Sequence, residues 1–397
     1  MSTDRAIAEQ AAQLAAAHPT DICVDTSIVH HLRYGGGQIV MDQAIERRSV
    51  TVRTLVGGHL GIVHSERCDP EGLRHAVERA ASLAKVKRGP TELEQLPDPQ
   101  SLSHFDGRDE ALMRWPEGDK HALVVEQLKR AKSNGLLLAG SVSSGSNSRT
   151  LLSSRGAVLS EEGSSVKAQF IGQTAEASGY SHALCSSLDQ LNLHALCDEA
   201  IHKATLASKR VDLDIGRYDV VLEPHAVAEL LEWMGGIAFT GQSVEEGSSF
   251  VGARRGESVT GANITLFDDA SCPFGLGLSS RFDGEGRSPQ RVTFIDAGKA
   301  GDVVHSSASG ARKGCISTGH SDGSGGEQIN HIHMAGGQAT IESLVGSMKR
   351  GIWVNRFHYV NGLLDPPKAT MTGLTRDGCL YVEDGQPIGG FAPMRFT

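Results

Sequence analysis

The chain has 397 residues and a mass of 42.1 kDa, enough for more than one ordinary domain with a large buried core. Hydrophobic residues make up 39% and charged residues 21%, which is typical of a globular protein and excludes disorder as the main state. The net charge of -9 argues against a nucleic-acid or anionic-membrane surface. No apolar run approaches the roughly 18–20 residues of a membrane span, and no signal peptide is recognised. We therefore expect a cytoplasmic protein without nucleic-acid or membrane partners.

The seven cysteines are scattered along the chain, and none forms a CxxC pair. An odd number without regular spacing fits neither a disulfide framework nor a zinc site made only of cysteines. The cysteines are therefore expected to be reduced thiols that serve as small core or loop residues.

The first half is predicted to mix helices and strands. Helical patterns, rich in alanine or opened by a proline, occur at 4–17, after Asp69, at 120–133 and at 188–207. Strands are predicted at 21–29, 44–56, 60–63, 136–159 and 164–173. A proline-containing stretch at about 88–118 has no period and is predicted to be a linker.

Glycine is concentrated in the second half, where 30 of the 47 glycines follow residue 212. Such density is typical of antiparallel sheets and barrels that turn corners through bulges and close backbone approaches. With a charged break at 209–216, this predicts an N-terminal α/β domain over 1–212 and a glycine-rich, β-dominated domain over 213–397. The predicted elements of this second domain are helices after Pro224 and at 341–349, and strands at 219–222, 259–267, 291–297, 330–334 and 379–382.

Several motifs in the second half have structural explanations. Residues 319–323 match GxSxG, but the glycines and serines that follow do not start the helix that a nucleophile elbow needs. His331 and His333 share one face of a predicted strand, without an obvious third metal ligand. No glycine-rich nucleotide-binding motif occurs.

Two further groups of titratable residues lie in the same half. His225 and Glu229 are four residues apart on one helix face, a spacing that suits a side-chain pair better than a zinc-peptidase helix. His225 is expected to point away from the apolar stripe of this helix, toward a cleft or a partner. Four carboxylates (Asp268, Asp269, Asp283 and Glu285) lie in a turn-rich tract that favours solvated turn residues over a calcium or amine site.

Taken in order, these motifs resemble the TldD/PmbA family of two-subunit intracellular metalloproteases. The matching landmarks are the segments 267–269, 281–286, 317–320, 373–378 and 395–397. The N-terminal half is similar in layout only. The resemblance implies an α+β fold, with a mixed α/β first domain and a second domain of antiparallel, barrel-like sheet.

Within this family, one subunit carries an HExxxH helix and a late cysteine that bind zinc, and the PmbA or TldE type lacks them. The six motif positions fall here on residues 224–229, where Pro224 has no donor atom and Glu229 stands at the second ligand position. The chain also ends before the place of the late cysteine. The resemblance therefore implies a subunit with no cofactor of its own, in a heterodimer with a TldD-type chain that holds the zinc.

The resemblance also implies a chamber for a peptide or amide substrate, which this subunit helps to shape. We expect the tract 272–286 near it, with Asp268, Asp269, Arg281, Asp283, Glu285 and His320 as chamber residues. Two alternatives stay open. One is a self-sufficient hydrolase with His225 and Glu229 as catalytic candidates, aided by the His331/His333 pair, or with Ser321 as nucleophile. The other is a non-catalytic assembly or binding protein. The sequence does not choose between leader peptides, toxins and natural-product intermediates as substrate.

Overall fold

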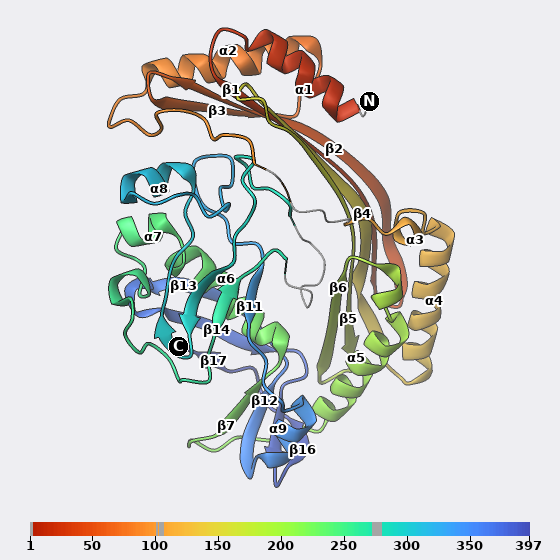
Figure 1. The fold of residues 1–397 in the computed structure, drawn as a ribbon. Coiled ribbons are helices and arrows are strands. Elements are labelled where there is room, and N and C mark those ends of the chain that lie inside the picture. Colours follow the sequence, from red (N-terminus) through yellow and green to blue (C-terminus); the bar gives the residue numbers. More distant parts are fainter. Residues whose placement is uncertain (1–2, 101, 103–106, 272–279) are drawn as a thin grey trace.

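The computed structural model describes residues 3–100, 102, 107–271 and 280–397. Its largest element is a six-stranded antiparallel sheet in the order β3-β2-β1-β4-β5-β6. The strands are β1 (Thr20–Gly35), β2 (Gln38–Val56), β3 (His59–Ser65), β4 (Leu137–Ser153), β5 (Val158–Gln173) and β6 (Ser178–Cys185). Figure 1 shows these long strands curving around the C-terminal half of the chain.

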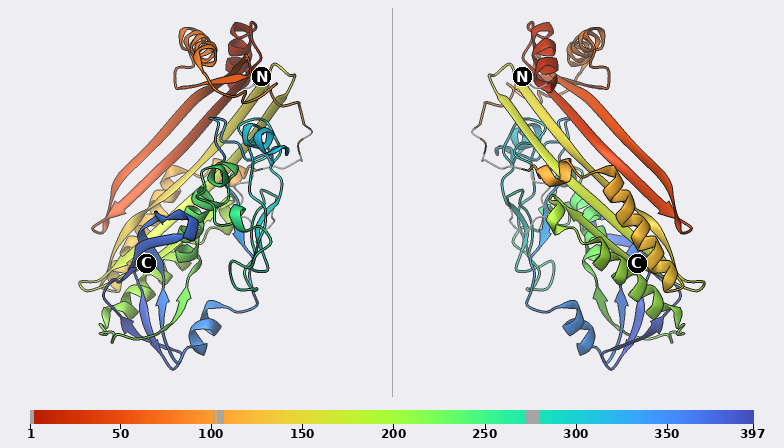
Figure 2. Two further views of the ribbon diagram at one scale, coloured as in Figure 1. Left: turned by 90° about the vertical axis from the view of Figure 1, so that its left-hand side faces the viewer. Right: turned by 90° about the vertical axis from the view of Figure 1, so that its right-hand side faces the viewer.

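Helices cover the outer face of this sheet. They are α1 (Thr3–Leu14), α2 (Pro70–Val86), α3 (Glu110–Met113), α4 (Glu117–Ser133) and α5 (Leu193–Ser208), with a 3-10 turn at Leu188–Gln190. Because side chains alternate along a strand, Ile22 and Val24 of β1 pack with alanines of α1 and α2. The intervening residues, such as Asp25 and Ser27, face the C-terminal half. Figure 2 shows α4 and α5 on one side of the sheet and the C-terminal half on the other.

The C-terminal half contains three smaller sheets. They are ordered β10-β9-β8-β11, β16-β15-β12-β7 and β13-β14-β17. The strands are β7 (Asp219–Leu222), β8 (Leu266–Asp268), β9 (Val292–Asp296), β10 (Lys299–Ala300), β11 (Ile332–Met334), β12 (Arg350–Val354), β13 (Arg356–Asp365), β14 (Thr370–Arg376), β15 (Leu380–Glu383), β16 (Gln386–Gly390) and β17 (Arg395–Phe396). All pairings are antiparallel except β12 with β7.

Four helices and two 3-10 turns complete the described part of this half. They are α6 (Pro224–Ala238), α7 (Gly241–Glu245), α8 (Ser307–Lys313), α9 (Ile341–Ser347), and the turns Gly252–Arg254 and Pro366–Lys368. Helix α6 packs between two apolar clusters, with Leu231 and Ala238 in one and Ala226 in the other. The predicted α+β fold is confirmed, and the three C-terminal sheets are open in the part of the chain that the structure describes.

Several predicted element boundaries were wrong. The stretch 136–159 is two strands joined by a turn, and 259–267 becomes strand only from Leu266. Strand β6 and the pair β13 and β14 were missed. The predicted linker at 88–118 contains α3 and the first residues of α4. Among the described residues, no helix is long and apolar enough to cross a membrane.

Candidate functional site

Helix α6 begins directly after β7, and a buried ion pair fixes its first turn. Glu223, the residue before the helix, places Oε2 2.8 Å from Nζ of Lys203 on α5. The same ammonium lies 3.1 Å from Oδ1 of the buried Asn355. Burial raises the pKa of Glu223, and the charge of Lys203 opposes that shift. The start of α6 is therefore held against the outer helix α5 and the end of β12.

His225, in the first turn of α6, contacts the inner face of strand β6. Its ring centroid lies 5.6 Å from that of Tyr180 and 5.3 Å from that of His182, both nearly edge-on. Burial, with the neighbouring His225, lowers the pKa of His182 to about 4. Burial also lowers the pKa of His225. The expectation that His225 points to an open cleft was wrong, because its ring is half-buried against the chain's own sheet.

An arginine closes the other side of this aromatic group. The guanidinium carbon of Arg356 lies 4.1 Å from the centre of the Tyr180 ring, a cation–π distance. Its Nε lies 2.8 Å from Oδ2 of Asp377, and Ser178 donates to the other oxygen of that carboxylate. Tyr180, His182 and Arg356 were not among the residues predicted from the sequence. The only local signal was the alternation of Tyr180 and His182, which places both rings on one face of a strand.

Glu229 lies one turn further along α6. Its Oε2 is buried without a hydrogen-bond partner, and burial raises the pKa of the carboxyl group. No set of three histidine, cysteine or acidic side chains that could hold a metal ion occurs among the described residues. Pro224 has no donor atom, and the His225 ring is in contact with two aromatic rings. The residues present at the motif positions therefore do not fit the zinc ion that the family resemblance implies for its other subunit.

Asp268 and His320 meet in the interior. His320 Nε2 lies 3.0 Å from Oδ1 of Asp268, and its Nδ1 lies 2.9 Å from the carbonyl oxygen of Thr318. The other oxygen of Asp268 accepts the backbone N–H of His331 at 2.8 Å. His333 stacks on the ring of Phe267. Both predicted chamber residues are buried, and they fix the course of the segment that carries His331.

Asp283 and Glu285 are also buried, in a loop that docks on the large sheet. Asp283 accepts backbone N–H groups from Ser321, Glu285 and Arg287 at 2.8–2.9 Å. Burial and the nearby Glu285 raise its pKa, and these hydrogen bonds oppose the shift. Glu285 binds Arg53 of β2 through one oxygen and the N–H of Ser307 through the other. Glu285 joins this loop to the large sheet, and Asp283 holds the loop together and against Ser321. Neither carboxylate is a solvated turn residue.

The remaining predicted chamber residues lie nearer the surface. The backbone N–H of Arg281 donates to Glu161 of β5 at 2.7 Å. Asp269 accepts from Ser271 and pairs with Arg291 at 3.3 Å. Residues 272–279 of the predicted chamber tract lie outside the described residues.

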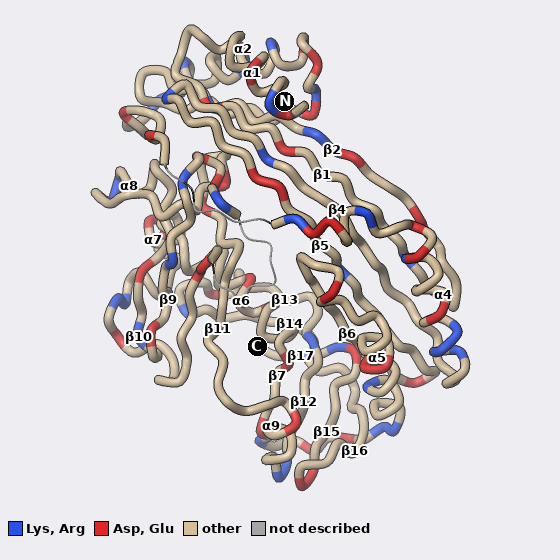
Figure 3. Tube along the Cα trace, turned by 45° about the vertical axis from the view of Figure 1, so that its right-hand side comes forward, with Lys and Arg blue, Asp and Glu red and all other residues tan. Residues whose placement is uncertain are grey.

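A groove of about 580 Å³ lies between the inner face of the sheet and the C-terminal half. Its lining includes Arg47, Asn147 and Arg149 from the sheet, and Asn330 and His331 from the segment before β11. Residues of both charges occur along the strands of this sheet (Figure 3). Arg149 is paired with Asp25 at 2.7 Å, so the groove is polar without being uniformly basic or acidic.

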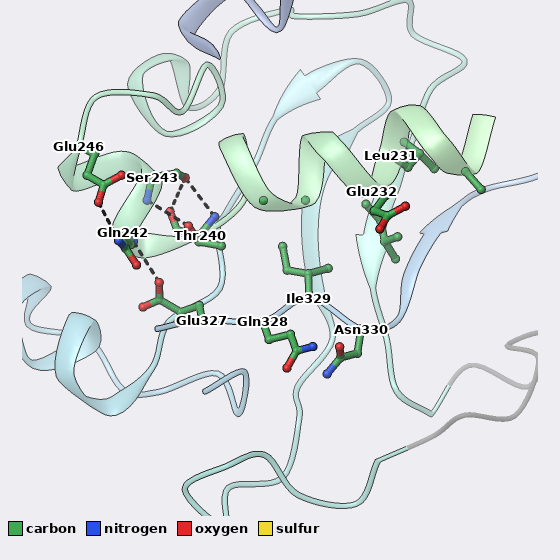
Figure 4. A pocket seen from close by; sticks show the side chains of 14 residues that line it. Leu231, Glu232, Thr240, Gln242, Ser243, Glu246, Glu327, Gln328, Ile329 and Asn330 are labelled. Atoms are coloured by element: carbon green, nitrogen blue, oxygen red, sulfur yellow. Dashed lines mark hydrogen bonds between the residues drawn. The ribbon is translucent and has the colours of Figure 1, made fainter. Parts of the chain in front are cut away.

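A second cavity, of about 570 Å³, lies between α6 and the segment 327–332 (Figure 4). Asn330 lines both this cavity and the groove, so the two adjoin at that residue.

Ser321 is not placed as a nucleophile. Its side chain is buried, and its hydroxyl oxygen accepts the N–H of Gly323 at 3.2 Å. Within the described residues, no histidine forms a hydrogen bond with that hydroxyl, and the neighbouring His320 is bound to Thr318 and Asp268. A serine nucleophile needs an adjacent base, so this geometry does not support the Ser321 alternative.

The long curved sheet and the C-terminal half that it surrounds form a fold shared with a solved structure. TldE from Thermococcus kodakarensis superposes with a TM-score of 0.87 at 19% identity, covering 99% of this chain and 91% of that one. That likeness shows the fold.

The chain belongs to the TldD/PmbA family. Residues 215–397 match the PmbA/TldA metallopeptidase C-terminal domain, and residues 21–84 match PmbA/TldA metallopeptidase domain 1. A protein of Methanothermobacter thermautotrophicus described as a metalloprotease is 21% identical over 84% of this chain and 75% of its own length. An uncharacterized protein of Methanocaldococcus jannaschii is 25% identical over 47% of this chain, which covers only 44% of that relative.

Proposed function

We propose that this chain is the zinc-free, TldE-like subunit of a heteromeric, cytoplasmic metallopeptidase that cleaves amide bonds in peptides or peptide-like intermediates. The partner would be a TldD-type chain with an HExxxH helix, which would hold the zinc and activate water for attack on the amide. This chain would shape and close the substrate chamber.

The first turn of α6 is the observation that carries this proposal. At the positions of the family's zinc motif stand Pro224, which has no ligand atom, and His225, whose ring contacts Tyr180 and His182. Glu223 and Lys203 fix this turn in place. A helix that keeps its place in the fold, with Pro224 at the first ligand position and His225 packed on aromatic rings, suits a subunit that supports chemistry on another chain.

The groove and the α6 cavity support the chamber role. Both are lined by side chains of the C-terminal half, and the groove is also lined by the inner face of the sheet. Extended peptides are commonly bound through backbone hydrogen bonds, with pockets for alternate side chains. A surface of this shape would receive an unfolded chain and exclude folded ones.

Reconstitution tests the proposal. This chain and an HExxxH-bearing relative from the same source are purified separately and mixed, and complex formation, bound zinc and cleavage of an unfolded peptide are measured. We expect a stoichiometric complex that cleaves the peptide, with zinc on the partner and no turnover by this chain alone.

Three results would contradict the proposal. Tightly held zinc on this chain that is lost in His225→Ala, or turnover by this chain alone after chelator treatment, would favour a self-sufficient hydrolase. A complex that forms but has the same activity as the partner alone would favour a non-catalytic assembly protein.

A further inference from the structure

The cavity beside α6 is large enough to receive a side chain. Its volume of about 570 Å³ falls in the range of small-ligand sites. Leu231 of the helix and Ile329 and Ile332 of the opposite wall supply its apolar lining. Figure 4 shows Ile329 directed toward the helix, with the amide groups of Gln328 and Asn330 beside it.

Small residues of α6 keep this cavity open. Ala228, Gly235 and Gly236 line it from the helix side. A Cβ atom added at Gly236 would meet no heavy atom within 4 Å, and one added at Gly235 would come no closer than 3.9 Å to Ile329. Neither glycine has the positive φ that would require glycine there, so the free space comes from missing side chains.

The charge of the lining is negative. None of its described residues is a lysine, arginine or histidine, and three are glutamates. Glu327 accepts from Ser306 and from the N–H of Gln242, and Glu246 accepts from the Gln242 side chain. Glu232 is exposed, and no hydrogen bond or ion pair joins its side chain to another described residue. Its negative charge also contributes to the raised pKa of Glu229.

The wall opposite α6 includes two residues whose peptide groups are not paired with another backbone group in the described part of the chain. Among the described residues, the peptide groups of Ile329 and Asn330 make no backbone–backbone hydrogen bond, although those of Gln328 and His331 do. An extended peptide can pair with such an unoccupied edge. Asn330 also lines the groove on the sheet, so the same chain could continue there.

We propose that the α6 cavity receives a lysine or arginine side chain of an extended peptide. The aliphatic stem would lie on Leu231, Ile329 and Ile332, and the cationic head would face Glu232. The peptide backbone would pair with Ile329 and Asn330. This inference rests on the proposed chamber function and names the substrate class that this subunit selects.

Binding to the full-length chain tests the inference directly. The probes are three blocked peptides of alanine and serine that differ only at a central lysine, norleucine or glutamate, titrated by calorimetry at low ionic strength. We expect the lysine peptide to bind about three- to fivefold more tightly than the norleucine peptide, because an exposed charge pair contributes up to about 1 kcal/mol. The glutamate peptide should bind most weakly.

Two variants with matched controls locate the site. Gly236→Leu should weaken all binding at least about tenfold by filling the cavity, whereas Gly118→Leu, at another uncrowded glycine in α4, should not. Glu232→Gln should abolish the preference for lysine over norleucine and keep norleucine binding unchanged. Glu78→Gln, on the exposed side of α2, should leave the preference intact.

The inference is overturned if the lysine peptide shows no saturable binding up to about 5 mM. It is also overturned if the Glu232→Gln variant keeps the preference for lysine over norleucine. These failures are distinguishable from failure of the proposed function. A reconstituted pair that cleaves lysine and norleucine peptides equally keeps the proposed function and rejects the subsite. Lysine-selective binding without any partner-dependent cleavage supports the subsite and rejects the proposed function.

Discussion

The guanidinium of Arg53 on β2 lies 2.9 Å from the carboxylate of Glu285, 232 residues later in the chain. Both side chains are almost completely buried. Arg53 also lies 3.2 Å from Asp21 of the neighbouring strand β1, and Glu285 accepts the N–H of Ser307 at the start of α8. The single cation Arg53 therefore joins the large sheet to the loop that contains Glu285.

Replacing Arg53 should be strongly destabilising. Arg53→Met leaves Asp21 and Glu285 buried without their counter-charge, and loss of one partner of a buried pair costs about 3–5 kcal/mol. Urea unfolding measures the change in the free energy of unfolding. Arg312→Met, which removes an exposed pair with Glu245, should cost less than about 1 kcal/mol. Equal losses in the two variants would show that Arg53 does not join the two halves as described.

A methyl group at Gly61 of β3 should not be tolerated. Its Cβ would lie 1.9 Å from the carbonyl oxygen of Ala80, because α2 packs directly on the strand at this point. Gly61→Ala should therefore destabilise the protein by about 1–3 kcal/mol. Gly118→Ala in α4 meets no atom within 4 Å and should be neutral or slightly stabilising. Thermal unfolding compares the two, and an unchanged midpoint for Gly61→Ala would contradict this packing.

Protonation of the His182 and His225 pair should weaken the fold. The pKa of His182 is lowered from 6.5 to about 4, so between these pH values the unfolded chain binds more protons than the folded chain. Stability from this group is therefore complete above pH 6.5 and decreases as the pH falls toward 4. When the pH is lowered from 7.5 to 4.5, the melting temperature of the wild type should fall relative to that of His182→Gln. A difference independent of pH would contradict the lowered pKa.

Ser321→Ala should leave peptide turnover by the reconstituted pair unchanged. The Ser321 hydroxyl is buried and accepts only the N–H of Gly323 among the described residues, so it is not available to attack a substrate. The loss of one hydrogen bond should cost about 1 kcal/mol of stability. A serine-directed fluorophosphonate should not label the wild-type chain at this position. Labelling that is lost in Ser321→Ala would revive the serine hydrolase alternative.

Much of the fold was predictable because the signals are local. The alternation at 50–56 and the proline at the start of α6 reflect backbone preferences that act within a few residues, and both elements occur as expected. Strand β6 gave only a short signal, the alternation of Tyr180 and His182, because Ser178 and Gly179 disfavour a strand. It is held by β5 on one edge, α5 on one face and His225 on the other.

The family, the α+β class and the lack of a ligand atom in the side chain of Pro224 could be recognised from the order of residue types alone, because each depends on which residues follow one another. The packing of the folded chain was needed to show that Asp283 and Glu285 are buried, that Glu285 pairs with Arg53, that His225 packs on β6, and that Glu232 lines an open cavity. Burial, and pairing between residues that are far apart in the chain, depend on how sheets and helices pack. A turn-rich acidic tract has the same local sequence pattern whether its carboxylates are hydrated or paired with a buried arginine.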